Sequence, residues 1–317
     1  MGRQRRVLRW GQSAYETDAD LALETHGAAQ LGLHYDLAPD PRTVPDLHEV
    51  DALVVTSKAQ VTAEVLAGFA GSLVLTTTSG WDHIDLPAAR VRGITVGRSP
   101  LARRDAVVEQ ALSMATGLLR RFPSQLARAR AGVWARGELP ELDPLRLQDG
   151  PLLVVGMGVI GRRMADWAQS IGVEVWGVDP LGVPDGVRAV ELDDGLAHAQ
   201  AVTVHCALSS TSRGLLDVAR VGRMRPDAVL VNTSRGDVLD VDAAVSAVKE
   251  GRLRGFATDV FATEPEPELA AYSGVEGVWL TPHSAGYSRG LGQRVADEVV
   301  AGLSAWAEGR PLPHEVA

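Results

Sequence analysis

The 317-residue sequence has one cysteine, Cys206, so no disulfide can form within the chain. Cys206 lies at the end of an apolar run, which predicts a buried and unreactive thiol. No apolar stretch approaches the roughly 20 residues that span a bilayer. The run that follows the basic N-terminus is also too short for the core of a signal peptide. These absences predict a cytoplasmic protein.

Basic residues are also scarce relative to acidic ones, with 31 Lys and Arg against 40 Asp and Glu and a net charge of −9. Surfaces that bind nucleic acid usually carry excess positive charge, so we expect no nucleic-acid partner. The apolar fraction of 45% is ordinary for a globular protein. Because the chain is longer than one hydrophobic core usually serves, its length predicts two domains.

Short apolar runs alternate with segments of helical length, the pattern of an α/β fold with parallel sheets. Residues 105–122 repeat apolar side chains at helical spacing and predict a long helix, whereas the polar residues 137–150 predict a loop. The expected strands fall into two series: 6–10, 34–37, 52–56, 73–77 and 94–96, then 152–155, 174–178, 201–205, 228–232, 255–259 and 278–281.

The last predicted helix, residues 293–308, begins after the second series of strands has ended. It has no strand left to cover there, so we expect it to return to the first series. The sequence thus predicts two Rossmann-like, doubly wound domains. A cofactor domain at 99–287 would be inserted into a discontinuous substrate domain at 1–98 and 288–317.

A dinucleotide fingerprint opens the second series. The apolar run 152–155 leads into G-x-G-x-x-G at Gly156, Gly158 and Gly161, and a helical pattern follows at once. The first glycine permits the tight turn, the second lets a pyrophosphate approach the backbone, and the third allows close packing of helix on strand. Helix N-termini also present unpaired N–H groups to anions.

Asp179 ends the next predicted strand, near the spacing of about 20 residues at which such motifs carry a ribose-binding acid. A carboxylate there accepts hydrogen bonds from ribose hydroxyls and repels a 2′-phosphate. The following residues, Pro180, Leu181 and Gly182, include no arginine to receive that phosphate. The sequence therefore favours NAD over NADP.

Polar side chains follow three successive strands of the second series. Arg235 follows the strand that ends at Asn232, Asp259 and Glu264 follow the next, and His283 follows the last. The carboxyl ends of parallel strands meet at one edge, where α/β sheets place their ligands. Hydride transfer to a ketone requires a proton donor, a cation for the carboxylate and carbonyl, and an acid that tunes the donor. These residue types supply all three.

At these positions the chain resembles the D-isomer-specific 2-hydroxyacid dehydrogenases, which include phosphoglycerate, glycerate, formate and D-lactate dehydrogenases. The family patterns N-x-[SA]-R-G, D-V-F-x-x-E-P and T-P-H-x-[AG]-[GS] occur here in order, in the segments 232–236, 259–265 and 281–286. The resemblance covers nearly the whole chain. It implies a cleft between the domains, a homodimer built on the cofactor domains, and a 2-hydroxy or 2-oxo acid substrate.

The resemblance also implies residue roles. His283 is expected to be the acid/base, Glu264 to hydrogen-bond it, and Arg235 to hold the substrate carboxylate and carbonyl in its planar fork. Asp259 is expected beside the nicotinamide. The remaining residues expected to line the cofactor site are Val159, Ile160, Thr233 and Ser234.

Two N-terminal loops cradle the substrate carboxylate in the family. Here they correspond to the loop with Ser57 and Lys58 and the loop with Ser79 and Gly80. Trp81 lies where the family commonly has a bulky residue, so it forms an aromatic wall of the site or packs on its own loop. Thr78 replaces the usual glycine.

Three arginines depart from the family pattern: Arg98, where asparagine is common, and Arg103 and Arg104 near the start of the long helix, where cations oppose the helix dipole. One hypothesis is that they meet a second anionic group on the substrate, such as a phosphate, phosphonate or carboxylate. The alternative is that they are solvated or contact a partner subunit. Gln110, where the family often has histidine or an apolar residue, has no interpretation from sequence.

Two other functions remain open at this stage. Corepressors that sense NAD(H) share this fold and keep the same triad, and so do dehydrogenases of the phosphite type, which oxidise an inorganic anion. The chain has no extra tail or recognition segment of the kind that a corepressor would need, which favours an enzyme. No metal is expected, because no His, Cys and carboxylate residues have ligand spacing.

Overall fold

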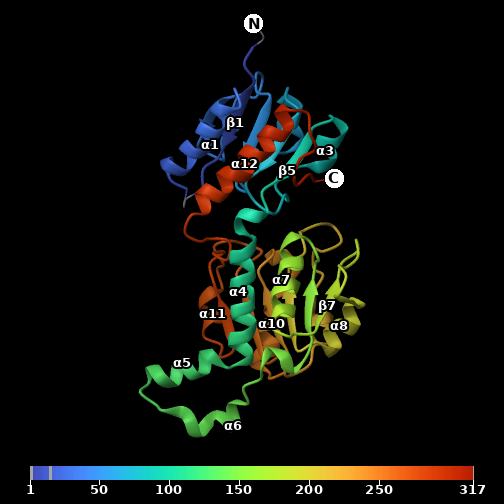
Figure 1. Cartoon of the computed structure of the whole chain (residues 1–317). Helices are drawn as coiled ribbons and strands as arrows, with labels where there is room; N and C mark the ends of the chain where they lie inside the picture. Colours follow the sequence, from blue (N-terminus) through green and yellow to red (C-terminus); the bar gives the residue numbers. More distant parts are fainter. Residues whose placement is uncertain (1–2, 14–15, 317) are drawn as a thin grey trace. The chain divides into compact units, whose positions relative to one another are not determined.

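The computed structural model describes residues 3–13 and 16–316, and the chain divides into two compact units (Figure 1). Unit 1 comprises Met1–Arg103 and Ser288–Ala317, and unit 2 comprises Arg104–Tyr287. The boundary falls within helix α4, which spans Leu101–Leu119. Both units are parallel-sheet α/β structures, as the sequence predicted.

Unit 1 is built on a five-stranded sheet with the order β2-β1-β3-β4-β5. All of its strand pairs are parallel. This order is one of the common doubly wound arrangements. An antiparallel bridge between Gly97 and Glu315 lays the C-terminal residues along β5. The strands are β1 (Arg6–Trp10), β2 (His34–Ala38), β3 (Ala52–Val55), β4 (Leu73–Thr76) and β5 (Thr95–Arg98).

Helices bury both faces of the unit 1 sheet. Side chains alternate across β1, so Val7 lies in the core beneath α1 (Asp18–Gln30) and α12 (Leu291–Ala307). Leu8 lies in the opposite core. That second core is covered by α2 (Ala63–Gly68) and α3 (Leu86–Val91). The late helix α12 thus shares a core with the first strand.

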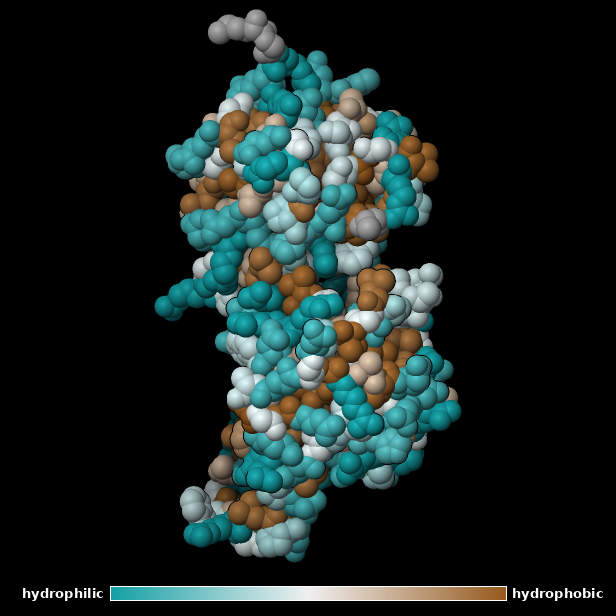
Figure 2. All heavy atoms as spheres, turned by 45° about the vertical axis from the view of Figure 1, so that its right-hand side comes forward, coloured by the Kyte–Doolittle hydropathy of each residue, from teal (hydrophilic) through white to brown (hydrophobic). Residues whose placement is uncertain are grey.

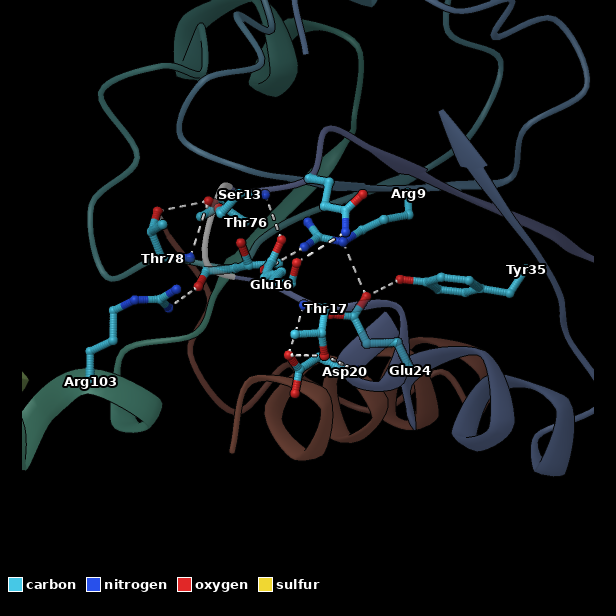
Figure 3. Close-up of polar contacts among 12 residues, drawn as sticks. Arg9, Ser13, Glu16, Thr17, Asp20, Glu24, Tyr35, Thr76, Thr78 and Arg103 are labelled. Carbon is cyan, nitrogen blue, oxygen red and sulfur yellow. Dashed lines mark hydrogen bonds and ion pairs between the residues drawn. The ribbon is translucent and has the colours of Figure 1, made fainter. Parts of the chain in front are cut away.

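Arg9 is a buried cation near the carboxyl end of β1, with none of its side chain exposed (Figure 3). It pairs with Glu16 at 2.8 Å and with Glu24 of α1 at 3.1 Å, and the Tyr35 hydroxyl donates to Glu24. Burial raises the pKa of Glu24, and Arg9 offsets only part of that effect. Glu16 also accepts from the Ser13 amide, so the cluster also binds the backbone at Ser13.

Unit 2 is built on a seven-stranded parallel sheet with the order β12-β11-β10-β9-β6-β7-β8. The chain builds outward from β6 to β7 and then restarts on the other side at β9, so the switch point lies between β6 and β9. The strands are β6 (Leu152–Val155), β7 (Val175–Val178), β8 (Arg188–Ala189), β9 (Ala201–Val204), β10 (Val229–Asn232), β11 (Gly255–Thr258) and β12 (Val278–Leu280).

Helices cover both faces of this sheet as well. Helices α4 and α7 (Val159–Ser170) pack on one face, in a core that includes Leu152 and Met164. Leu153 points to the opposite core, which is shared with α8, α9 and α10. The remaining helices of unit 2 are α5 (Phe122–Arg130), η1 (Ala135–Glu138), α6 (Leu139–Leu142), η2 (Leu147–Asp149), α8 (Leu192–His198), α9 (Val218–Val221), η3 (Gly236–Val238), α10 (Val241–Lys249) and α11 (Leu269–Ser273).

The predicted strands lie within a residue or two of those observed, but two expectations were wrong and one strand was missed. Helix α4 begins at Leu101 rather than at 105, and it ends at Leu119 because Arg121 adopts a left-handed conformation with φ of 56°. The polar stretch 137–150 contains α6 and η2 instead of being only a loop. The two-residue strand β8 was not predicted, because both of its residues are exposed and show no pattern.

Candidate active site

Three neighbouring strands of unit 2 end in register. Asn232 of β10 pairs with Thr258 of β11, which pairs with Leu280 of β12. The segments that carry Arg235, Glu264 and His283 therefore leave the sheet at one edge. The structure brings the predicted residues of these three segments into one neighbourhood of unit 2.

His283 and Glu264 form a direct pair. Nδ1 of the imidazole lies 2.8 Å from Oε2 and 3.0 Å from Oε1 of the carboxylate. Glu264 Oε1 also accepts from the Phe261 amide, which holds the carboxylate in place. The imidazole is about half exposed, at 47%. With Nδ1 turned toward Glu264, Nε2 is the nitrogen that can exchange a proton with a bound molecule.

The turn that carries Arg235 is fixed by Asn232, whose side chain is fully buried. Its Oδ1 accepts from the Ser234 amide and hydroxyl, and its Nδ2 donates to the Arg235 carbonyl. Next along the chain, a Cβ at Gly236 would overlap the Phe261 carbonyl carbon. Glycine thus allows the Arg235 turn to lie against the segment that leads to Glu264.

Asp259 is buried, with 1% of the residue exposed, and its carboxylate is surrounded by neutral donors. Its Oδ1 accepts from the Thr281 hydroxyl at 2.6 Å and the Ser284 amide at 2.8 Å, and its Oδ2 accepts from the Ala285 amide at 2.9 Å. Its backbone carbonyl accepts from the His283 amide at 2.7 Å. The segment that carries His283 is therefore folded around this carboxylate.

The glycine turn after β6 leads directly into α7, with Gly158 at its N-cap. Gly156 has φ of 94°, a conformation that favours glycine. A Cβ at Gly161 would overlap the Gly156 carbonyl oxygen, whereas one at Gly158 would meet no atom within 4 Å. Gly161 serves packing, and the space over Gly158 is open to a pyrophosphate. Val159 and Ile160 form the first turn of α7.

The edge at the β6–β9 switch point has the polar groups that a dinucleotide needs. Asp179, after β7, accepts from the Met157 amide at 2.7 Å and the Leu181 amide at 2.8 Å, so its carboxylate lies beside the glycine turn. The ring nitrogens of His205 and the hydroxyl of Thr233 are buried without a hydrogen-bond partner. Buried polar groups are rarely left unpaired, so these atoms fit a site that a bound cofactor completes.

Comparison with known proteins assigns this arrangement to a family. The model of the D-isomer specific 2-hydroxyacid dehydrogenase, NAD binding domain, matches residues 112–285, more than half of the chain. The chain belongs to the D-isomer specific 2-hydroxyacid dehydrogenase family. It is an NAD-dependent oxidoreductase with the Rossmann cofactor domain of that family.

Among the relatives are two curated enzymes of the family. The chain is 31% identical to the glyoxylate reductase of Thermofilum pendens over 278 residues, covering 84% of this chain and 81% of that protein. It is 29% identical to the D-3-phosphoglycerate dehydrogenase of Haemophilus influenzae, covering 88% of this chain and 70% of that protein. Several other phosphoglycerate dehydrogenases are longer, and the chain spans 51% or less of their length.

A solved structure shows the same fold. The D-lactate dehydrogenase of Aquifex aeolicus, determined with NAD and lactic acid, matches with a TM-score of 0.81. The match covers 96% of each chain at 23% sequence identity.

The residues that the family resemblance placed at the substrate lie at the carboxyl edge of the unit 1 sheet. Ser57 and Lys58 follow β3 and are exposed, whereas Ser79 and Gly80 follow β4 and are half-buried. The guanidinium of Arg98, at the end of β5, lies 4.8 Å from the centre of the Trp81 ring. Its Nη1 donates to the Ser79 carbonyl at 3.1 Å.

Arg103 and Arg104 are both engaged within the chain. Arg103 is buried and donates to the Thr77 carbonyl, and Arg104 pairs with Asp105 at 2.8 Å. A carboxylate of α12, Glu298, accepts from the Ala102 amide in the first turn of α4. This negative charge explains how two arginines are tolerated at a helix N-terminus.

Sequence reasoning missed two contributors to the site of unit 2. Asn232 was noted only as part of a motif, although it holds the Arg235 turn. Gln110 was left without interpretation, and in the structure its amide contacts Asp259 and Thr281. No periodic signal could have found this contact, because the partners are 149 and 171 positions away. Among the described residues, no metal-binding cluster of His, Cys, Asp and Glu occurs, and no helix could cross a membrane.

Two glycines of the turn provide a matched test of the cofactor site. In Gly161→Ala the methyl group meets the Gly156 carbonyl, so we expect the free energy of unfolding to fall by about 2 kcal/mol. In Gly158→Ala the methyl group enters open space, so we expect the thermal midpoint to stay unchanged while the Kd for NADH rises at least about tenfold. Thermal unfolding and NADH fluorescence titration measure both effects. If Gly158→Ala binds NADH as tightly as the wild type does, the pyrophosphate does not bind at this turn.

Proposed function

We propose that the chain interconverts a small 2-oxo acid and its 2-hydroxy acid, with His283 as the acid/base, Glu264 as its partner and Arg235 as the ligand of the substrate carboxylate and carbonyl. The observation that carries this proposal is the His283–Glu264 pair, which leaves Nε2 to exchange protons. Residues Gly156, Gly158, Val159, Ile160, Gly161, Asp179, Thr233, Ser234 and Asp259 would hold NAD.

The proposed roles follow from ordinary side-chain chemistry. When bound, NADH supplies a hydride to the carbonyl carbon. The guanidinium of Arg235 presents parallel N–H donors that fit a carboxylate and an adjacent carbonyl oxygen. Nε2 of His283 delivers a proton to the developing alkoxide, and the carboxylate of Glu264 stabilises the protonated imidazole before that transfer. In the reverse direction His283 removes the hydroxyl proton.

Substitutions in the pair separate proton transfer from binding. We expect His283→Asn to lower kcat/KM for a 2-oxo acid by about 10²- to 10⁴-fold while NADH affinity is kept. Glu264→Gln removes the carboxylate that holds Nδ1 of His283, so we expect it to lower kcat/KM by about tenfold while NADH affinity is kept. Stopped-flow assays and NADH titrations measure these effects. Glu266, a half-buried carboxylate two positions along the chain, substituted to Gln, is the control. A wild-type kcat/KM in Glu264→Gln would rule out Glu264 as the partner of His283.

We further propose that the substrate has a second anionic group and that Arg98 recognises it. Burial lowers the pKa of the Arg98 guanidinium, and the nearby charge of Glu298 does not make up the difference. Its Nε is buried without a hydrogen-bond partner. A guanidinium that lacks full compensation gains from an added anion. The stacking of Arg98 on Trp81 fits a built site as well as a structural contact.

A substrate panel tests this part of the proposal. We expect 2-oxo acids that carry a second carboxylate or a phosphate to exceed pyruvate in kcat/KM by about tenfold or more. Arg98→Gln should reduce that preference more than it reduces turnover of pyruvate. Arg104, whose partner is Asp105, gives the control variant Arg104→Gln, which should keep the preference. Equal efficiencies for all substrates, untouched by Arg98→Gln, would leave Arg98 as a structural residue only.

We also propose a homodimer that forms through the segment from α5 to α6. Several of its apolar side chains are exposed: Phe122 (45%), Leu126 (54%), Val133 (45%), Trp134 (88%) and Leu139 (36%). Figure 2 shows brown, apolar atoms at the lower end of unit 2, where Figure 1 places α5 and α6. Clustered exposed apolar groups favour burial against another protein surface, and a second copy is the partner that the family resemblance implies.

A substitution at an equally exposed residue outside the α5–α6 segment is the control for the dimer proposal. Trp134 and Val91 are both 88% exposed, but Val91 lies in unit 1, outside the α5–α6 segment. Trp134→Glu should convert the dimer to a monomer, and Val91→Glu should not. Light scattering after size-exclusion chromatography measures the mass. A wild-type chain that elutes as a monomer at micromolar concentration would overturn this proposal.

The half-buried Cys206 supports the cytoplasm as the proposed compartment. Burial raises the pKa of its thiol to about 11, so the thiolate is scarce at neutral pH. A lone unreactive thiol suits a reducing environment.

A further inference from the structure

We propose that Gln110 is a positioning residue, which holds Asp259 and Thr281 so that the segment bearing His283 keeps its working conformation. This inference rests on the proposed function, because it concerns how the proposed acid/base is held. It assigns a role to a residue of α4 that lies outside the triad.

Gln110 bridges the ends of two strands with one nitrogen. Its Nε2 donates to the Thr281 hydroxyl at 2.8 Å and to Asp259 Oδ1 at 3.1 Å. Thr281 in turn donates its hydroxyl hydrogen to the same carboxylate oxygen at 2.6 Å. The three side chains thus form a closed ring of hydrogen bonds. The Thr281 hydroxyl has one hydrogen, which it donates to Asp259, and the Gln110 amide supplies the hydrogens for the other two bonds.

Gln110 lies in a different part of the chain from the other donors to the Asp259 carboxylate. Thr281, Ser284 and Ala285 belong to the segment that folds around Asp259, so they move with it. Gln110 comes from α4, whose neighbouring residues Val107, Val108 and Ala111 are buried in unit 2. It is therefore a contact that ties the carboxylate and the segment to a helix packed in the core of unit 2.

The segment needs such a restraint because His283 has a φ of 52°. A residue with a Cβ is strained in this left-handed region and remains there only when its surroundings determine it. The His283 amide donates to the Asp259 carbonyl, and the next two amides donate to the Asp259 carboxylate. If Asp259 shifts, all three contacts shift with it, and the imidazole loses its direction.

An amide suits this position better than other side chains of its size. Glutamate would place a second carboxylate against Asp259, and methionine would supply no hydrogen for either oxygen. Histidine can donate one ring N–H and so can replace part of the bridge. These differences make the inference testable by substitution.

The test compares Gln110→Met with Gln110→His in the full chain. We expect Gln110→Met to lower kcat for 2-oxo acid reduction by about tenfold, with the Kd for NADH within about threefold of the wild-type value. Gln110→His should recover most of that loss. The control is Gln169→Met, which also removes an amide bond, from Gln169 Nε2 to the Gly186 carbonyl at 2.7 Å, and it should leave kcat unchanged.

A second measurement does not depend on turnover. Hydrogen exchange at the amides of Ser284 and Ala285, both bonded to Asp259, should speed up by about tenfold in Gln110→Met and not in Gln169→Met. If the wild-type chain reduces no 2-oxo acid but exchange responds in this way, the proposed function fails and the positioning role stands. Unchanged exchange, or a kcat within about twofold of the wild-type value in Gln110→Met, overturns the inference.

Discussion

The active edge of unit 2 depends on a buried anion that is satisfied by neutral donors. The Asp259 carboxylate receives hydrogen bonds from two side chains and two backbone amides. Removing a charge from water is costly, and this cost is met only if nearly every lone pair finds a donor. The requirement works in both directions: the carboxylate needs the segment around it, and the segment takes its shape by surrounding the carboxylate. The orientation of the His283 imidazole therefore follows from the hydrogen bonds that stabilise the Asp259 carboxylate.

The second constraint on the site is close packing of backbone on backbone, which is possible because glycines lie at the contacts. At Gly161 the helix touches the preceding turn, and at Gly236 the Arg235 turn touches the segment before Glu264. Neither contact leaves room for a side chain. Gly161 could be predicted from the sequence, because a glycine at this spacing after a strand indicates close packing of helix on strand. The placement of the Arg235, Glu264 and His283 segments at one edge could be predicted for a similar reason, since parallel strands in register end at the same edge.

What the sequence could not provide were contacts across long separations between residues of ordinary type. Gln110 lies on a helix whose pattern predicts only a buried face, and nothing in that pattern names Asp259 as its partner. Arg9 occupies one position of a strand where a charged residue usually faces water, yet helices cover both faces of this sheet. For Arg98, the sequence left open a ligand or a structural contact. The stacking on Trp81 and the uncompensated charge of Arg98 are compatible with both.

The division of unit 1 into two stretches of chain has a consequence for biosynthesis. Unit 2 is continuous, so all of Arg104–Tyr287 is synthesised before α12 is made. Val7 and Val54 share a core with Val295 and Val299 of α12, so this core cannot be completed until α12 emerges from the ribosome. The stretch of unit 1 that is translated before unit 2 therefore cannot complete its core until all of unit 2 has been synthesised. During that interval its open sheet face is exposed apolar surface, the kind that chaperones recognise.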